Sequence, residues 1–217
     1  MDDRDEHEKP HDTPGMELIT AAFQTRRSGI IAPGMRDEIR TDRLLLRPLG
    51  TSDAERMFAY RGNPEVARFQ TWEPQSLEDV RSFIAGQRDR NADEPGWYQT
   101  AIVERPTGIL LGDIGIHILE SDPRQVELGF TLAPNAQNRG HATEAVRAVL
   151  HHLFVQREKH RVFASTDPRN LRAIALLHRL GFRQEAHFIE SLWFKGEWAD
   201  DLIFAMLRRE WNIRCAR

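Results

Sequence analysis

The stretch between residues 126 and 153 constrains the fold more than any other part of this chain. Residues 126–132 alternate apolar and polar side chains, a pattern typical of a β-strand, and a helical pattern of apolar residues begins at Gly140. Between the two lies the sequence Gln137-Asn138-Arg139-Gly140-His141-Ala142. The first turn of a helix leaves backbone N–H groups unpaired and carries a partial positive charge, so it suits a phosphate. Small residues at 140 and 142 allow a phosphate to approach that backbone.

A second element follows this helix at a suitable distance. Residues 161–166 form a short apolar run typical of a strand, and Asn170 and Ala173 then open a helical run that ends at Gly181 and Phe182. The first motif alone would also fit an ordinary polar loop before a helix. Two matches in this order, each between a strand and a helix, argue against chance. Together they resemble the cofactor site of the GNAT superfamily, the acyl-CoA-dependent N-acetyltransferases.

The resemblance implies that acetyl-CoA is the co-substrate. Backbone N–H groups from Asn138 to Ala142 would bind its pyrophosphate, with side-chain donors added by Gln137 and Arg139. The pantetheine arm would lie beside residues 130–132, and Asn170 would bond its amide end. The residues expected to contact acetyl-CoA are Phe130, Thr131, Leu132, Gln137, Asn138, Arg139, Gly140, His141, Ala142, Thr143, Asn170 and Ala173.

Other phosphate sites are disfavoured by the same stretch. No Lys-Ser or Lys-Thr follows Gly140, as a P-loop requires, and no Gly-x-Gly-x-x-Gly dinucleotide loop occurs there. Arginines do cluster in the following helical region, at positions 169, 172, 179 and 183. We expect most of them to face solvent and one or two to meet the 3′-phosphate of the coenzyme.

The order of elements indicates an α/β (α+β) domain that resembles the GNAT fold. The patterns predict the order βααβββαβαββ over residues of about 41 to 211. The implied architecture is a central, mixed, mostly antiparallel, twisted sheet of about seven strands with flanking helices. Its strands at 126–132 and 161–166 splay apart. We assign residues 37–217 to a single acyl-CoA N-acyltransferase domain and residues 1–36 to an N-terminal extension that we expect to be flexible.

Local signals predict several boundaries. Ser52 with Glu55, and Ser76 with Asp79, have the spacing of capping boxes and predict the starts of two helices. Two apolar runs separated by residues 105–108 predict an antiparallel hairpin. In the C-terminal part, residues 191–197 are predicted to form a loop and residues 198–207 the final strand.

Acetyl transfer needs a base, because an alkylamine with a pKa of about 10 is protonated at neutral pH. A carboxylate on the splayed strand can accept that proton directly or through water. We select Glu127 as the catalytic base, since it faces away from the apolar set of its strand and the resemblance implies an acid at this place. A glutamate at the start of a strand can equally remain in solvent. His117, on the neighbouring predicted strand, is the reserve base.

The proton donor for the leaving thiolate is harder to assign. Many members of the superfamily carry a tyrosine seven residues after the asparagine, and this chain has Leu177 there. Ser165 is the catalytic candidate in its place, with Ser191, water or help from the backbone N–H of Leu132 as alternatives. Ser165 would equally suit a small residue of the core.

The predicted activity is transfer of an acetyl group from acetyl-CoA to a primary amine by direct attack in a ternary complex. Residues 193–201 resemble the penultimate loop and last strand of the Rim-type branch, whose members are similar to ribosomal-protein N-terminal acetyltransferases. This implies a protein N-terminus or a small amine, such as a polyamine, as acceptor. Two alternatives stay open: a non-catalytic acyl-CoA-binding or sensing domain, and an antibiotic-modifying, aminoglycoside-type N-acetyltransferase.

Composition narrows the partners. The net charge of -3 provides no field to attract nucleic acid. The nine histidines lack the spacing of metal ligands, so we expect no metal. No apolar run approaches the roughly 20 residues of a membrane span. A single cysteine, Cys215, agrees with a cytoplasmic location. Similar proteins often form homodimers, so a dimer stays open.

Overall fold

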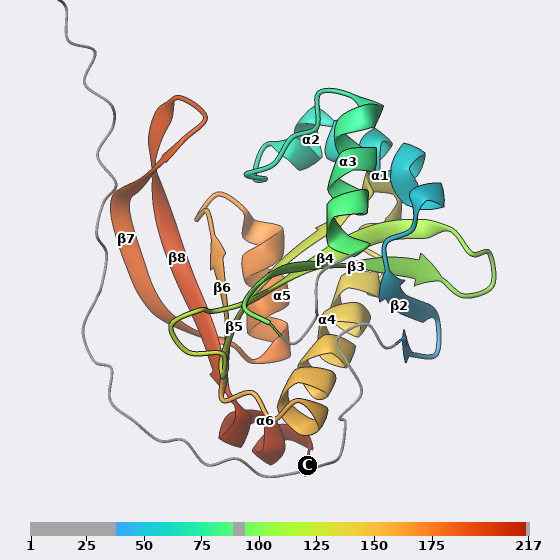
Figure 1. Ribbon diagram of the computed structural model, residues 1–217. Helices are drawn as coiled ribbons and strands as arrows, with labels where there is room; N and C mark the ends of the chain where they lie inside the picture. The colour runs from blue at the N-terminus through green and yellow to red at the C-terminus, as the bar shows by residue number, and fades with distance from the viewer. Residues whose placement is uncertain (1–37, 89–93, 216–217) are drawn as a thin grey trace, which may run out of the picture. The chain divides into compact units, whose positions relative to one another are not determined.

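The structure of this protein, a computed structural model, describes residues 38–88 and 94–215 (Figure 1). The proposed N-terminal extension, residues 1–36, lies outside these residues. Within them, one eight-stranded sheet has the strand order β1-β2-β3-β4-β5-β6-β8-β7. The strands are β1 (Ile39–Arg40), β2 (Leu44–Pro48), β3 (Gly96–Glu104), β4 (Leu110–Ile118), β5 (Gln125–Leu132), β6 (Arg161–Thr166), β7 (Arg183–Phe194) and β8 (Glu197–Leu207).

The pairing of the strands confirms the predicted mixed, mostly antiparallel sheet. Only β5 and β6 pair in parallel, and the other neighbouring strands of the described residues pair antiparallel. The helix between β5 and β6 supplies the crossover that a parallel pair requires. The prediction of about seven strands omitted β1, because a two-residue strand shows no periodicity.

Helices cover both faces of the sheet (Figure 1). One face carries α1 and α3, which pack on Ala101 and Val103 of β3. The other face carries α4 and α5, which pack on Ile102 and on the apolar residues of β5 and β6. Successive strand residues point to opposite faces, so the sheet separates two apolar cores. The helices are α1 (Ala54–Arg61), α2 (Pro64–Ala67), α3 (Leu77–Arg88), α4 (His141–His151), α5 (Leu171–Leu180) and α6 (Arg208–Cys215).

Helix α4 owes its position to a stripe of apolar residues. Ala145, Val146, Val149 and Leu150 are completely buried against the sheet. Their spacing of three and four residues places them on one side of the helix. Burying one large aliphatic side chain contributes about 1.5–3 kcal/mol, so the stripe holds the first turn of α4 beside the end of β5.

Strands β5 and β6 separate after three paired positions. The paired residues run from Gln125 with Arg161 to Glu127 with Phe163, and β5 continues to Leu132 without a partner in β6. This confirms the predicted splay between the two strands. The opening begins immediately after Glu127.

Some backbone N–H and carbonyl groups of β5 point toward this opening. The Ala133 N–H group donates to the Leu111 carbonyl group over 2.8 Å. Alternate residues of an antiparallel strand bond the same neighbour. Phe130 and Leu132 therefore direct their backbone polar groups away from β4 and toward the opening, where the Gln137 side chain already bonds the Leu132 carbonyl group.

The start of the first helix differs from the prediction. The capping box proposed for Ser52 and Glu55 is wrong, because the chain first forms a 3-10 turn at Thr51–Asp53. Asp53, not Glu55, accepts the Gly50 N–H group over 2.7 Å. The second predicted capping box, at residues 76–79, is confirmed by its two reciprocal hydrogen bonds.

The C-terminal part differs from the prediction in two places. The loop predicted at residues 191–197 is wrong, because β7 extends to Phe194 and β8 begins at Glu197. Lys195 and Gly196 form the turn, with φ angles of 51° and 86° that suit a two-residue hairpin. Helices α2 and α6 were not predicted, since helices of four and eight residues carry too little periodicity to detect.

Candidate functional site

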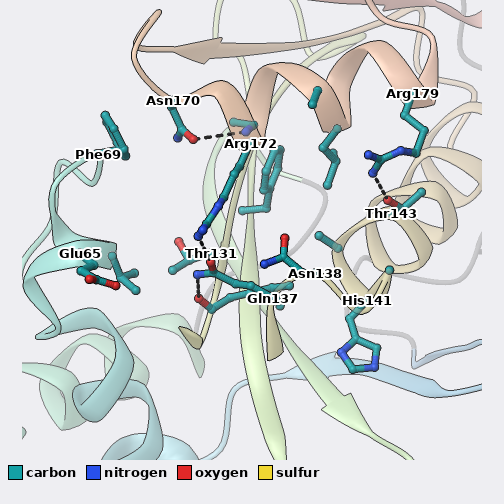
Figure 2. Close-up of a pocket in the computed structure, with 18 of the residues that line it drawn as sticks. Glu65, Phe69, Thr131, Gln137, Asn138, His141, Thr143, Asn170, Arg172 and Arg179 are labelled. Carbon is teal, nitrogen blue, oxygen red and sulfur yellow. Dashed lines mark hydrogen bonds between the residues drawn. The ribbon is translucent and has the colours of Figure 1, made fainter. Parts of the chain in front are cut away.

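A cavity of about 720 Å³ lies beside the free part of β5 (Figure 2). Its walls come from β5, from the loop before α4, from the first turn of α4, from α5, and from α2 with the segment that follows it. Every residue expected to contact acetyl-CoA lines this cavity except Arg139. The two catalytic candidates, Glu127 and Ser165, are not among the lining residues.

The loop before α4 carries unpaired backbone N–H groups. Asn138 and Gly140 have φ angles of 59° and 79°, and Gly140 is the N-cap of α4. In the part of the chain that the structure describes, no hydrogen bond occupies the backbone N–H groups from Asn138 to Ala142. Successive free N–H groups at the start of a helix form a binding site for phosphate oxygens.

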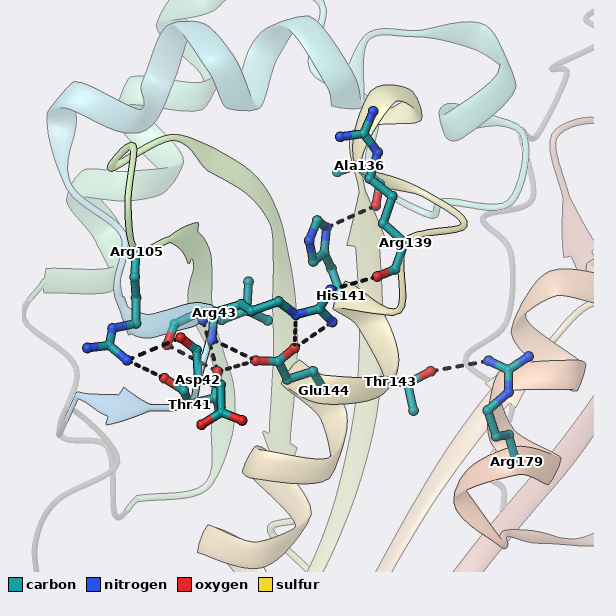
Figure 3. A network of polar contacts seen from close by, with 11 residues as sticks. Thr41, Asp42, Arg43, Arg105, Ala136, Arg139, His141, Thr143, Glu144 and Arg179 are labelled. Atoms are coloured by element: carbon teal, nitrogen blue, oxygen red, sulfur yellow. Dashed lines mark hydrogen bonds and ion pairs between the residues drawn. The ribbon is translucent and has the colours of Figure 1, made fainter.

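A polar network holds this loop in place (Figure 3). Arg43 donates to the Arg139 carbonyl group over 3.0 Å and to the Glu144 carboxylate over 2.6 Å. Thr41 donates a further hydrogen bond to Glu144, also over 2.6 Å. Burial raises the pKa of Glu144, but the hydrogen bonds from Thr41 and Arg43 outweigh it and lower that pKa. Because Arg43 neutralises Glu144, the start of α4 stays attractive to an anion.

Arg139 contributes to this network through its carbonyl group, and its side chain lies outside the cavity lining. His141 is buried, and its ring Nδ1 lies 3.2 Å from the Ala136 carbonyl oxygen. Both residues therefore shape the loop. The backbone, more than these side chains, faces the cavity.

Gln137 connects β5 to α5. Its Nε2 donates to the Leu132 carbonyl group over 3.0 Å, and its Oε1 accepts from Arg172 over 2.6 Å. Figure 2 shows the Arg172 side chain extending from α5 to reach Gln137. We expected Gln137 to donate to the pyrophosphate directly. Its side-chain amide is instead engaged at both ends, and it positions the Arg172 guanidinium group in the cavity wall.

Two arginines of α5 bring positive charge to the cavity. Arg172 and Arg179 line it, and Arg179 donates to the Thr143 hydroxyl group over 3.2 Å. Among the described residues neither has a carboxylate partner, whereas Arg169 and Arg183 each form ion pairs with two carboxylates. Two of the four clustered arginines therefore carry a charge that no carboxylate of the described residues neutralises, and their contact with a 3′-phosphate stays a prediction.

The ends of α5 have different roles. Asn170 caps its start by accepting the Ala173 N–H group over 3.2 Å, and both residues line the cavity. Gly181 ends the helix with a φ angle of 91°, and Phe182 is buried in the core. Neither lines the cavity. Leu177, at the position of the usual tyrosine, is also buried in the core and supplies no proton donor.

Glu127 occupies the last position at which β5 pairs with β6. Its neighbours Val126 and Leu128 point into the core under α4, so Glu127 lies on the opposite face. Its Oε2 is 3.3 Å from the His117 Nδ1, and the His117 ring stacks on Trp97 with 4.6 Å between centroids. The two side chains are 26% and 27% exposed. The two candidate bases therefore form one pair beside the strand opening.

Ser165 lies two residues beyond the last β6 residue that pairs with β5. Its hydroxyl group donates to Asp201 over 2.6 Å. Burial raises the pKa of Asp201. Because Ala164 points into the core under α4, Ser165 lies on the same face of the sheet as Glu127. Ser165 and Glu127 thus border the opening from different strands.

Sequence reasoning missed a polar network that reaches the cavity from α1. Asp113 is completely buried, accepts from Tyr60 over 2.6 Å and is ion-paired with Arg61. Gln70 continues the network, since its Oε1 accepts from Arg61 and from Thr131. The available signal was Asp113 itself, the one acidic residue of β4, which requires a partner when buried.

A second missed contact links the β7–β8 hairpin to the end of α2 and to the segment after it. The Lys195 Nζ donates to the Ala67 carbonyl group over 2.7 Å and to Glu73 over 2.8 Å. Next to the turn, Trp193 and Trp198 contact each other edge to face. Two segments far apart in the sequence are therefore joined on the α1–α3 side of the opening.

The described residues limit other kinds of site. Within 38–88 and 94–215, no group of three or more His, Cys, Asp or Glu residues is arranged to hold a metal ion. No helix in the same residues is long and apolar enough to cross a membrane.

Known proteins are similar to this chain in sequence and in fold. Residues 43–183 match the family described as Acetyltransferase (GNAT) domain. The chain is 28% identical to the uncharacterized N-acetyltransferase YnaD of Bacillus subtilis over 174 residues, which cover 80% of this chain and 99% of YnaD. It is 31% identical over 85 residues to the ribosomal protein uS5 alanine N-acetyltransferase of Escherichia coli, covering 39% of this chain and 44% of that enzyme. A GNAT-family acetyltransferase from Bacillus anthracis has the same fold, with a TM-score of 0.72 and 26% identity, covering 80% of this chain and 100% of that one.

The site geometry fits the co-substrate of this family. Free N–H groups before α4 suit a diphosphate, and Arg172 and Arg179 are cations without a carboxylate partner in the described residues. The resemblance found in the sequence is confirmed, and the alternative of a non-catalytic sensing domain is not supported. The chain belongs to the GNAT acetyltransferase family and is an acetyl-CoA-dependent N-acetyltransferase.

Proposed function

We propose that this enzyme acetylates the primary amine of a protein N-terminus or of a small molecule, by direct attack in a ternary complex. The observation that carries the proposal is the position of the cavity. It reaches from the free N–H groups before α4 to residues 130–132 of β5, and Glu127 marks the point where β5 leaves β6. Bound acetyl-CoA supplies the thioester at which an amine attacks, with the coenzyme thiolate as leaving group.

The α4–α5 side of the cavity holds the coenzyme. The backbone N–H groups from Asn138 to Ala142 donate to the diphosphate, and the positive end of α4 stabilises its charge. Arg172 and Arg179 hold the 3′-phosphate. The backbone groups of Phe130, the backbone N–H group of Leu132 and the amide of Asn170 bond the pantetheine arm.

Glu127 eases deprotonation of the amine, with His117 as its hydrogen-bond partner. A carboxylate is ionised at neutral pH, so it can take up a proton that the ammonium group must lose before attack. The quarter-exposed side chain leaves room for a water molecule between Glu127 and the amine. The imidazole of His117 orients the carboxylate.

Ser165 donates the proton that the leaving thiolate needs. Its position just past the last β5–β6 pair supports this role. Its hydrogen bond to Asp201, a carboxyl group whose pKa is raised by burial, holds the serine hydroxyl group in position. We also propose a cytoplasmic location, which fits a chain with a single cysteine. The name of the Escherichia coli relative supports a protein N-terminus as acceptor.

A thiol-release assay with acetyl-CoA tests the proposal. The amine panel contains a peptide with a free N-terminus, spermidine, an aminoglycoside and a matched peptide with a blocked N-terminus. We expect the free peptide or spermidine to accelerate thiol release and the blocked peptide to have no effect. Acceleration by the aminoglycoside alone would favour the antibiotic-modifying alternative. Binding of acetyl-CoA without acceleration by any amine would contradict the proposed reaction.

A further inference from the structure

A buried ion pair lies under the α2 side of the cavity. The side chains of Arg61 and Asp113 are 8% and 0% exposed. Asp113 also accepts hydrogen bonds from Tyr60 and Gln99. Removing two charges from water costs several kcal/mol per ion, so such a pair contributes little net stability. What it does provide is a guanidinium group that is held in one orientation.

This guanidinium group determines the orientation of Gln70. Arg61 Nη1 donates to Gln70 Oε1 over 3.3 Å, and the Thr131 hydroxyl group donates to the same oxygen over 2.9 Å. An arginine has donors only, so the amide cannot turn its own NH₂ group toward it. The oxygen of Gln70 must face Arg61 and Thr131.

The NH₂ group of Gln70 is consequently left for the cavity. Gln70 lines the cavity, and in the described residues its Nε2 has no hydrogen-bond partner. Two N–H donors in a fixed orientation are therefore available to a ligand in the cavity. A ligand fits this position when it offers a hydrogen-bond acceptor, such as a carbonyl oxygen.

Thr131, Gly129 and Glu127 lie on one face of β5, because side chains alternate along a strand, and we call this face between Gln70 and Glu127 the lane. A Cβ atom at Gly129 would meet no atom within 4 Å. An acceptor whose amine approaches Glu127 across Gly129 therefore extends its next atoms toward Gln70. This lane lies on the α1–α3 side of the sheet, opposite the helices that hold the coenzyme.

We infer that Gln70 selects acceptors that carry a carbonyl group next to the amine, as a peptide N-terminus or an amino acid amide does. Its NH₂ group donates to that carbonyl oxygen, while Arg61 and Asp113 act as positioning residues behind it. A polyamine offers no such acceptor and would leave the amide donors unpaired. Glu65, the one acid among the lining residues that the structure describes, attracts any cationic amine and does not separate the two classes. The inference rests on the proposed function and names its substrate class.

Gln70→Met tests the inference, because methionine keeps the length of the side chain and removes both donors. Thiol release is measured with L-alaninamide and with 1,2-diaminopropane, which replaces the carbonyl group by a methylene group. We expect wild type to prefer alaninamide, since sites built to hydrogen-bond a group discriminate against analogues that lack it. Gln70→Met should lower kcat/KM for alaninamide about 10–100-fold and change the value for diaminopropane less than about twofold.

Controls separate the possible outcomes. The thermal shift with acetyl-CoA shows that Gln70→Met is folded and binds the co-substrate, and Gln75→Met serves as a matched variant on the exposed part of the same segment. Gln75→Met should leave kcat/KM unchanged for both acceptors. If Gln70→Met lowered kcat/KM equally for both acceptors, or did not lower it for alaninamide, the proposed role of Gln70 would be overturned and the acetyl transfer would stand. No thiol release from wild type with any amine would overturn the proposed function as well.

Discussion

The two sides of the cavity are built in different ways. On the side proposed to bind the coenzyme (the coenzyme side), backbone N–H groups of one short loop are free, and side chains such as Glu144 and Gln137 hold the loop and its neighbours. On the side proposed to bind the acceptor (the acceptor side), the wall consists of side chains from segments far apart in the chain. Gln70 contacts Thr131 across 61 residues, and Lys195 contacts Glu73 across 122 residues.

This difference explains how one fold can serve different acceptors. A diphosphate is common to every acyl-CoA, and backbone groups that do not depend on side-chain identity can bind it. An acceptor is distinguished by its own polar groups, so its site must be built from side chains. Substitutions on the coenzyme side should therefore affect all acceptors equally, and substitutions on the acceptor side should affect some more than others.

Gly140→Glu should have the largest effect on the coenzyme side. A side chain at this left-handed position brings a negative charge to the phosphate site, so binding of acetyl-CoA should be lost. Thermal melting measures it, because a ligand at 100 times its Kd stabilises the wild type by about 2.7 kcal/mol. Gly108→Glu is the matched control: it has the same left-handed geometry, a φ angle of 69°, in an open turn. If acetyl-CoA raised the melting temperature of Gly140→Glu as much as that of the wild type, the loop would not be the diphosphate site.

Glu127→Gln should have the next largest effect, which should be on catalysis and not on the binding of acetyl-CoA. Loss of the base lowers kcat/KM for amines about 100–10,000-fold, and the thermal shift with acetyl-CoA should stay unchanged. The deficit should shrink as the pH approaches the pKa of the amine, because the amine then loses its proton unaided. Glu120→Gln, an exposed acid just beyond β4, is the control. A deficit independent of pH would contradict a role in deprotonation.

Arg179→Ala tests whether Arg179 binds the 3′-phosphate of the coenzyme. It should weaken binding of coenzyme A about tenfold and barely change binding of dephospho-coenzyme A, which lacks the 3′-phosphate. Calorimetric titration with both ligands measures the difference. Arg169→Ala, which removes an arginine already paired with Asp167 and Glu197, should change neither affinity. Equal losses for the two ligands would place the 3′-phosphate elsewhere.

Glu144→Gln should produce the smallest effect, visible in the pH dependence of stability. The pKa of Glu144 is lowered in the folded state, so its contribution is present above the ordinary pKa of a glutamate, about 4.3, and is lost as the pH falls through the folded value. The variant should therefore unfold at a lower temperature at neutral pH and lose less stability on acidification. Parallel melting curves for variant and wild type between neutral and acid pH would argue against this ion pair.

The comparison also shows what the sequence alone could predict. The strand end, the loop and the start of α4 are neighbours in the chain, so their periodicity and the small residue at Gly140 predicted a phosphate site directly. The same local signals predicted Asn170 as the start of α5. These features depend on backbone conformation within about ten residues.

The acceptor side could not be predicted in the same way. No local pattern indicates that Gln70 reaches Thr131 or that Arg61 pairs with Asp113, because these contacts arise only when α1 and α2 pack on the sheet. Asp113 was a sign that a partner exists, but it did not identify the partner. The length of β7 was missed for a related reason, since the tight turn at Lys195 depends on backbone angles that the sequence there does not reveal.

A crystal structure of the enzyme with coenzyme A tests the central claim most directly. The account predicts that the diphosphate oxygens accept hydrogen bonds from the backbone N–H groups between Asn138 and Ala142, and that the thiol lies at the opening between β5 and β6 near Glu127. A diphosphate bound elsewhere, or a thiol directed away from that opening, would contradict it.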